Sequence, residues 1–424
     1  MPIIEPDAKL YTDTTKSGKE QDIVEKNSIL SASVGICWQG HDCQFTDWSF
    51  LPNINLWRDY LPPEIEPKLP GLSVGDEIIQ HYKAGELLEN SLSSEKHTVS
   101  YNQFQPPKKG LSPIQPLLGR YYPKDFFTKV NGVHEGNKFP CRITAMNDQS
   151  ISIDLNHPLA GKDFDMVFRI DSIKMAGAER GGRCNDITAT ACDKGPGMQD
   201  SLADHDTNFF TDNPFSRLDS SDDSMFFKTP DLTPFWDSAA LQQVSDLYQT
   251  LIPEQAQVLD LMAGAHSPLQ ESGLDLKSVS CAGLNEAELD QNISCNSKFT
   301  VDVNSAKNLP FDENQFDTVL IHAAIEYVIN PEQLFAEILR ILKPSGRVII
   351  SFSNRSISEK AIQLWSGAHE FERPAIVLSY LRSNAGFGNF NSYSKRGEFR
   401  PEDDKLADRL LLSDPVYVIW ADKT

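Results

Sequence analysis

The sequence predicts an α/β domain built on a largely parallel sheet, preceded by a β-rich antiparallel domain. Residues 318–325 (TVLIHAAI) and 347–352 (RVIISF) are short apolar runs without alternation, as expected of strands that are covered on both faces. Residues 330–342 between them have the period of an amphipathic helix. Upstream, residues 151–155 and 164–170 alternate apolar and polar side chains, which is typical of half-buried antiparallel strands.

The helix between the two apolar runs has clear start and stop signals. Asn330 can cap its first turn, and Pro331 has the backbone φ angle that suits the first helical position. Pro344 and Gly346 end it. The residues expected on its apolar face are Leu334, Phe335, Ile338, Leu339 and Leu342. Strand, helix and strand then form one unit, for which a right-handed crossover is expected.

Composition limits the possible classes of protein. A chain of 424 residues corresponds to two or three domains, and its net charge of −21 argues against a general nucleic-acid or anionic-membrane surface. No apolar run approaches the ~18 residues of a membrane span, and no basic leader with an apolar run opens the sequence, so we expect a cytoplasmic protein. The seven cysteines are scattered and odd in number, which favours reduced thiols.

The chain divides at changes in composition. We expect an N-terminal extension (1–29), a β-rich domain (30–175), a linker rich in Gly, Asp, Ser and Thr (176–230) and the α/β domain (231–424). Five phenylalanines in the linker predict that it packs on one or both domains. They are Phe209, Phe210, Phe215, Phe226 and Phe227.

The sequence does not predict a metal site. Cys184, Cys192, His205 and Asp206 occur close together in the linker. Their spacing lacks the paired short intervals that are typical of zinc sites, so we assign no metal ligands.

Residues 311–354 strongly resemble the second half of a class I S-adenosylmethionine-dependent methyltransferase. The resemblance implies a doubly wound, Rossmann-like sheet with S-adenosyl-L-methionine as the cofactor. By position, Asp260 matches the acidic residue that opens the family's cofactor loop, and Gly264 is the one glycine kept from its triplet. Asp302, after the strand that ends FTVDVN, matches the carboxylate that accepts a hydrogen bond from the adenine amino group.

The resemblance leaves the ribose contact open. The family's second strand ends in an acid that holds the ribose hydroxyls, but Gly283 occupies that place here. Asn285 or Glu286, which follow it, could make the contact instead.

Further residues are expected on the acceptor side of the site. The family places groups that face the methyl and the acceptor at His322, Glu326 and Tyr327, and we assign His322 and Tyr327 as catalytic and Glu326 as substrate-binding. Arg355 and Lys360 follow the next strand and could bind an anionic acceptor. The alternative is that these side chains are ordinary core and surface residues.

Residues 119–173, with the turn NHPLAG (156–161), resemble FKBP-type peptidyl-prolyl isomerases of the SlyD-like branch, which carry a chaperone insert. The resemblance covers roughly residues 30–175, including the turn and strand at 71–78. It implies an apolar cup that binds a proline-containing or unfolded polypeptide.

Trp38 and Asp47 match the aromatic residue and the acid of that cup, with Phe45 between them. Two family aromatics are replaced by Leu88 and Met166, so we expect client holding to be stronger than isomerisation. The alternative is that these aromatic side chains are ordinary core residues.

The sequence therefore predicts a methyltransferase domain fused to an isomerase-like domain, acting on a methyl acceptor that the sequence does not name. The rival hypothesis is a non-catalytic binding or chaperone-like protein that retains both folds. The glycine-poor loop and the missing ribose acid favour the rival. Asp260, Asp302 and the intact 311–354 unit favour the enzyme.

Overall fold

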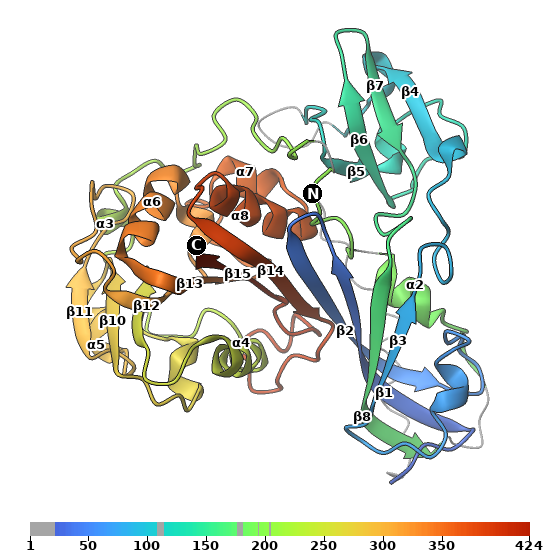
Figure 1. The fold of residues 1–424 in the computed structure, drawn as a ribbon, viewed down its shortest axis with the longest axis horizontal. Coiled ribbons are helices and arrows are strands. Elements are labelled where there is room, and N and C mark those ends of the chain that lie inside the picture. The colour runs from blue at the N-terminus through green and yellow to red at the C-terminus, as the bar shows by residue number, and fades with distance from the viewer. Residues whose placement is uncertain (1–21, 108–113, 176–180, 194, 203–204) are drawn as a thin grey trace. The chain divides into compact units, whose positions relative to one another are not determined.

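The structure is a computed structural model that describes residues 22–107, 114–175, 181–193, 195–202 and 205–424. The chain forms two compact units (Figure 1). The N-terminal unit extends to Phe209, and the C-terminal unit comprises Phe210–Thr424. Each unit has its own strands and its own core.

The N-terminal unit contains a sheet in which neighbouring strands are antiparallel. In spatial order its strands are β2 (Cys43–Asn55), β1 (Ser28–Gln39), β8 (Phe164–Met175) and β3 (Glu77–Tyr82). Alternate residues of β8 are buried along most of its length, which confirms the predicted half-buried strand. A short helix, α2 (Ile187–Cys192), follows β8.

A second antiparallel sheet is inserted between β3 and β8. Its strands, in spatial order, are β4 (Lys96–Ser100), β7 (Ser150–Asp154), β6 (Pro140–Met146) and β5 (Tyr121–Pro123). It has a separate apolar core that includes Phe127, Ile143 and Ile153. The short 3-10 turns of this unit are η1 (Glu66–Lys68), η2 (Ser93–Glu95), η3 (Tyr101–Gln103) and η4 (Lys124–Phe126).

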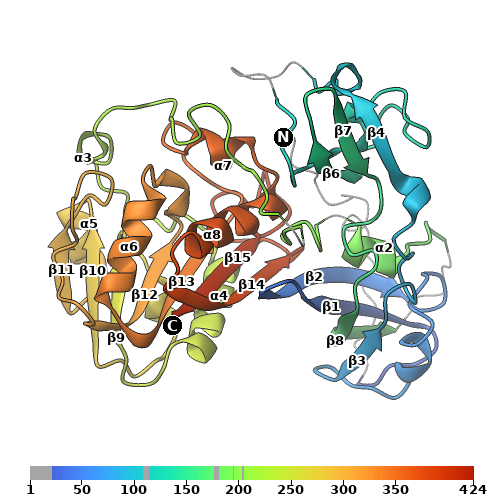
Figure 2. The same cartoon turned by 45° about the horizontal axis from the view of Figure 1, so that its top comes forward.

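The C-terminal unit has a mixed sheet of the kind that the sequence predicts (Figure 2). In spatial order its strands are β11 (Ser297–Thr300), β10 (Ser278–Gly283), β9 (Gln257–Leu261), β12 (Phe316–His322), β13 (Leu342–Phe352), β15 (Val416–Lys423) and β14 (Phe387–Arg396). The first five are parallel, and β15 is antiparallel to both of its neighbours. The order reverses direction between β9 and β12, so the carboxyl ends of these two strands flank the switch point where such sheets bind ligands.

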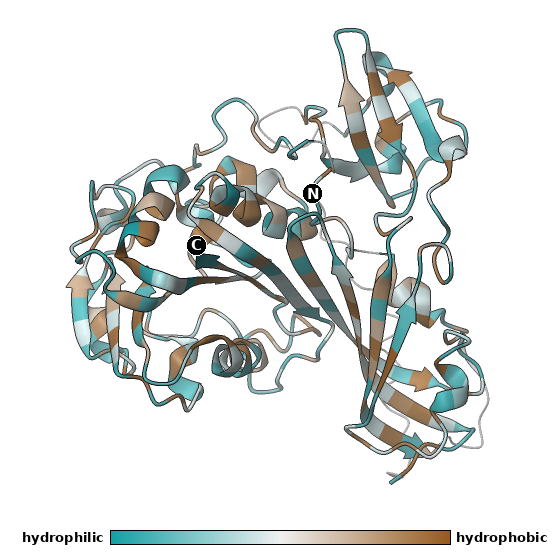
Figure 3. Ribbon diagram, viewed as in Figure 1, coloured by the Kyte–Doolittle hydropathy of each residue, from teal (hydrophilic) through white to brown (hydrophobic). Residues whose placement is uncertain are grey.

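Helices accompany this sheet. The longer ones are α4 (Ser238–Leu251), α6 (Pro331–Ile341) and α8 (Arg373–Arg382), and the shorter ones are α3 (Asp223–Phe226), α5 (Glu286–Gln291), α7 (Gln363–Gly367), η5 (Pro268–Glu271), η6 (Ile325–Tyr327) and η7 (Glu370–Glu372). Val244 and Tyr248 of α4 belong to one core cluster with Val258 and Leu320 of the sheet. Hydrophobic residues gather on the strands, whereas the loops are largely hydrophilic (Figure 3).

Helix α6 begins where the sequence predicts and ends slightly earlier. The Asn330 side chain accepts a hydrogen bond from the Gln333 N–H. Ile341 is the last apolar residue on the buried face, and the expected Leu342 instead opens β13. Ser345, near the start of β13, lies in the left-handed region, with φ of 62°.

Two other expectations need correction. Cys281 of β10 and Cys295 before β11 form a disulfide, so the cysteines are not all reduced. The linker phenylalanines are unevenly packed: Phe209 is 2% exposed, whereas Phe210 is 46% exposed.

None of the helices in the described ranges has the length and apolar character needed to cross a membrane.

Candidate functional site

A pocket of about 230 Å³ lies at the carboxyl ends of the parallel strands of the C-terminal unit. Five residues predicted from the sequence line it, namely Gly264, Asn285, Asp302, His322 and Tyr327. They lie at the end of β12 or in the segments after β9, β10, β11 and β12, so the sheet brings together residues that are far apart in sequence. Asp260, Glu326, Arg355 and Lys360, also predicted, are not among its lining residues.

Asp260 lies in β9 and does not line the pocket. Its side chain is buried, and Ser267 donates a hydrogen bond to it. Burial raises the pKa of this carboxyl group to about 6. Its visible role is to hold the loop that follows β9.

Asp302 lies in the loop after β11. Its Oδ1 accepts a hydrogen bond from the Asn304 N–H at 2.9 Å, which fixes one face of the carboxylate. Val301 and Val303 line the pocket on either side of it. Asn304 extends the arrangement by donating to the Tyr327 carbonyl oxygen at 3.0 Å.

Asn285 has a structural task at the start of α5. Its Oδ1 accepts from the N–H groups of Ala287 and Glu288, so it caps the helix. Its amide nitrogen donates to the carbonyl oxygen of Phe227 at 3.0 Å. Glu288, one turn into α5, also lines the pocket. Glu288 was not predicted from the sequence, since the local pattern does not separate it from the exposed Glu286 in the same first turn of α5.

His322 ends β12 and faces the pocket among buried polar partners. Its Nδ1 lies 2.8 Å from the Ser351 hydroxyl oxygen, and that hydroxyl lies 3.2 Å from the Tyr248 hydroxyl. The Trp236 ring packs edge-on against the imidazole at 4.4 Å. Burial lowers the pKa of His322 to about 3, so the imidazole is neutral near pH 7.

Tyr327 and Glu326 form the wall behind His322. The Tyr327 hydroxyl accepts a hydrogen bond from the Ile357 N–H at 2.8 Å, and burial raises its pKa. Glu326 is 1% exposed, and burial raises the pKa of its carboxyl group to about 7. The Tyr327 hydroxyl hydrogen-bonds to that carboxyl group. Glu326 therefore lies within the core, away from the position that would contact a substrate.

A segment that we call the strap, residues 219–235, covers one side of the pocket. Five of its residues line the pocket, namely Asp223, Phe227, Asp231, Thr233 and Phe235. Lys360 is fully buried, and its ammonium group lies 3.1 Å from the Asp223 carboxylate and donates to the Ser221 carbonyl oxygen at 2.6 Å. Lys360 is thus an anchor of the strap, and its buried, paired ammonium group is not presented to an anionic acceptor as expected from the sequence.

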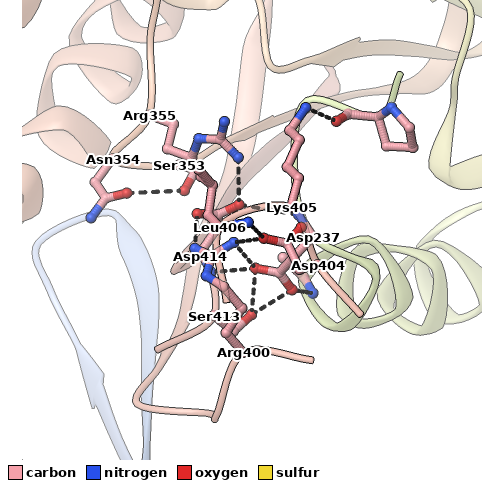
Figure 4. A network of polar contacts seen from close by, with 12 residues as sticks. Asp237, Ser353, Asn354, Arg355, Arg400, Asp404, Lys405, Leu406, Ser413 and Asp414 are labelled. Carbon is pink, nitrogen blue, oxygen red and sulfur yellow. Dashed lines mark hydrogen bonds and ion pairs between the residues drawn. The ribbon is translucent and has the colours of Figure 1, made fainter. Parts of the chain in front are cut away.

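Arg355 belongs to a buried polar network near the end of the strap (Figure 4). Its guanidinium donates to Asp414 at 3.1 Å and lies 4.7 Å from the centre of the Phe235 ring. Asp414 also pairs with Arg400 at 2.6 Å, and Asp237 accepts from the Ser413 hydroxyl at 2.8 Å. Arg355 is therefore occupied in holding the strap and the approach to β15.

In the N-terminal unit, the predicted cup residues share one face of the β1–β2 hairpin. The Trp38 and Phe45 rings stack at 4.9 Å, and both are buried. Asp47 is 2% exposed and accepts from the Gln199 side-chain amide at 3.0 and 2.8 Å. The segment that carries Gln199, residues 195–200, is buried throughout, and we call it the plug.

Residues 256–350 match the family model described as a methyltransferase domain. Norajmaline N-methyltransferase from Rauvolfia serpentina is 28% identical over 30% of this chain and 43% of its own length. A demethylmenaquinone methyltransferase from Paenarthrobacter aurescens (strain TC1) is 31% identical over 26% of this chain and 41% of its own. The chain thus spans less than half the length of these curated relatives.

One similar solved structure is the Burkholderia thailandensis 1,6-didemethyltoxoflavin-N1-methyltransferase with bound 1,6-didemethyltoxoflavin and S-adenosylhomocysteine. It is 21% identical, covers 44% of this chain and 80% of its own, and has a TM-score of 0.32.

The strand order and the family match together define the C-terminal unit as a class I S-adenosylmethionine-dependent methyltransferase domain. The cofactor predicted from the sequence, S-adenosyl-L-methionine, is confirmed for this domain. The matched residues lie within the C-terminal unit, so the isomerase-like interpretation of the N-terminal unit stays a prediction.

Proposed function

We propose that the C-terminal unit binds S-adenosylmethionine in the pocket and transfers its methyl group to an acceptor. The observation that carries this proposal is the meeting of Gly264, Asp302 and His322 in one pocket at the switch point of the sheet. The lining suits the cofactor: Leu284, Val301 and the carboxylate of Asp302 offer apolar surface and a hydrogen-bond acceptor to an adenine ring.

The bound cofactor would supply an electrophilic methyl group on a positively charged sulfur, and the protein has to bind, orient and shield it. His322 suits this environment because its low pKa keeps the imidazole uncharged, which avoids repulsion with the sulfonium. Tyr327 is likewise neutral and contributes a rigid aromatic wall. The strap would exclude water from this side of the pocket.

The proposal is tested by titrating the full chain with S-adenosylhomocysteine in a calorimeter. Asp302→Ala should weaken binding by about 1.5–3 kcal/mol, the scale for a hydrogen bond with one charged partner. Asp312→Ala is the matched control, since Asp312 is exposed and does not line the pocket. Absence of binding by the wild-type chain would contradict the proposal and favour the non-catalytic alternative.

We propose a second function for the N-terminal unit, the holding of apolar or proline-containing polypeptide in the manner of SlyD-like FKBP proteins. The stacked Trp38 and Phe45 beside Asp47, and the separate sheet inserted between β3 and β8, support it. Isomerisation should be the weaker activity, because Leu88 and Met166 replace rings that would favour the twisted amide.

Aggregation of an unfolded client and proline-limited refolding, measured with one preparation of the full chain, test this second proposal. Suppressed aggregation with little acceleration of refolding is the expected result. Strong isomerase turnover that Asp47→Ala abolishes would show instead that the cup is a working catalytic site.

A further inference from the structure

Strand β10 ends without an acidic residue, and the path of a neighbouring loop explains why. Gly283 is the last residue of β10, and a Cβ atom there would lie 2.1 Å from the carbonyl oxygen of Ala263. The Ala263 N–H donates to the Ala282 carbonyl oxygen at 2.9 Å, so the loop after β9 crosses the strand end directly. No side chain fits at position 283 while the loop takes this path.

Of the polar residues that follow β10, only some reach the pocket. Asn285 lines it, but its side chain caps α5 and donates to the strap at Phe227. Glu286 is exposed and is not among the lining residues. Glu288 is half-buried and lines the pocket, which leaves it as the available carboxylate on this side.

The two oxygens of Glu288 have different surroundings. Oε1 accepts a hydrogen bond from the Asp231 N–H of the strap at 2.9 Å. Oε2 lies 3.2 Å from the point that a Cβ on Gly264 would occupy, so it faces the loop after β9. Burial, together with the nearby Asp231 charge, raises the pKa of this carboxyl group. A ligand with two hydroxyl donors would stabilise the charged carboxylate by supplying hydrogen bonds in place of those lost from water.

We infer that Glu288 accepts the hydrogen bonds of the cofactor's ribose hydroxyls and, through its other oxygen, links the bound cofactor to the strap. This inference rests on the proposed function, because it requires the cofactor to occupy the pocket. A vicinal diol presents two O–H donors close together, which a carboxylate can accept. Glu288 thereby replaces the strand-end acid that Gly283 excludes, and it reaches the pocket from the helix instead.

The first experiment measures S-adenosylhomocysteine binding to full-length Glu288→Gln by calorimetry. Gln keeps one carbonyl oxygen for the Asp231 N–H but presents an uncharged amide to the ribose. Binding should weaken about ten- to a hundredfold. Glu286→Gln, in the same first turn of α5, is the matched control and should bind within about twofold of wild type.

The second experiment repeats both titrations with the 2′,3′-dideoxyribose counterpart of S-adenosylhomocysteine. If Glu288 contacts the ribose, wild type should bind the dideoxy ligand more weakly than S-adenosylhomocysteine. Glu288→Gln should bind the two ligands with similar affinity. The inference would be overturned if Glu288→Gln weakened the binding of both ligands by the same factor relative to wild type, because the effect of the substitution would then not depend on the ribose hydroxyls. Unchanged binding in a variant with native melting temperature would overturn it too.

The link to the strap has its own readout in amide hydrogen exchange. S-adenosylhomocysteine should slow exchange at Asp231 and its neighbours in wild type and should do so less in Glu288→Ala, which lacks both oxygens. Equal protection in the two proteins would overturn the link. Wild type that binds no S-adenosylhomocysteine would overturn the proposed function and this inference together, whereas wild-type binding with an unaffected Glu288→Gln would overturn the inference alone.

Discussion

The plug of the N-terminal unit and the strap of the C-terminal unit both cover polar and aromatic side chains, but with opposite results. The plug fills its surface: Gly197 is packed so closely that an added Cβ would lie 2.7 Å from the Pro158 backbone, and Gln199 is fully buried. The strap is held by an ion pair and by hydrogen bonds, and it leaves a pocket beneath it. Residue type alone does not distinguish a binding site from a core. What distinguishes them is whether the covering segment fills the space over the side chains or leaves a pocket.

The largest expected effect tests the ionic anchor of the strap. Lys360→Ala removes a fully buried ammonium group from beside Asp223, and the cost of breaking a buried ion pair is about 3–5 kcal/mol of unfolding free energy. Denaturant unfolding measures it. Lys405→Ala is the control, because Lys405 also donates to the strap, at the Thr233 hydroxyl and the Pro234 carbonyl oxygen, but is exposed. Equal, small losses in both variants would mean that the strap needs no ionic anchor.

A second test concerns the buried wall behind the pocket. The pKa of Glu326 rises from 4.5 to about 7 on burial, so the unfolded chain releases this proton at a lower pH than the folded protein does. Stability should therefore fall as the pH rises from about 4.5 to 7, by up to about 3 kcal/mol. Glu326→Gln should flatten that slope and be the more stable protein at pH 8. If the free energy of unfolding changed with pH in the same way in the two proteins, Glu326 would be ionised in the folded protein, with its charge stabilised by neighbouring groups.

The disulfide of the C-terminal unit gives a third test. Cys281→Ser with Cys295→Ser opens a link across a sequence separation of 14, which should cost about 2–3 kcal/mol. Thiol titration of the denatured wild-type chain should find five free cysteines of the seven, with no loss of stability in Cys184→Ser, whose thiol is exposed. Seven reactive thiols would restore the expectation drawn from the sequence.

The smallest effect concerns the plug. Gln199→Ala removes the amide that donates to Asp47 and should lower stability by about 1–3 kcal/mol, since a buried acceptor loses a donor. Gln149, exposed in the turn between β6 and β7, provides the matched alanine control. A melting temperature as high as that of the control variant would show that the plug contributes nothing to stability. The face that the plug covers would then not be part of the stabilising core of the N-terminal unit.

The local signals in the sequence were sufficient for β12, α6 and β13. The signals lie within the elements themselves: the two strands are apolar runs without alternation, and the helix begins with an Asn-Pro cap. Gly264, Asp302 and His322 were expected at the site from the resemblance to class I methyltransferases, and the structure brings them together because the residues at the carboxyl ends of parallel strands meet at one edge.

The errors at the site came from contacts that no local pattern encodes. Lys360 was expected to bind an anionic acceptor, but the strap, more than a hundred residues earlier in the sequence, supplies the carboxylates that pair with it. Cys281 and Cys295 meet only because β10 and β11 are neighbours in the sheet. Glu288 was missed because its place depends on how the loop after β9 crosses the end of β10.

The crossing of Ala263 over Gly283 also has an evolutionary consequence. An acidic residue cannot be introduced at the end of β10 by a single substitution, because any side chain at position 283 would strike the loop backbone. Relatives that carry an acid there should differ in the length or sequence of the loop corresponding to 262–266, and they should be free to lose the glutamate of α5. The two changes would be inherited as a pair, and chimaeras that mix one loop with the other acid arrangement should bind the cofactor poorly.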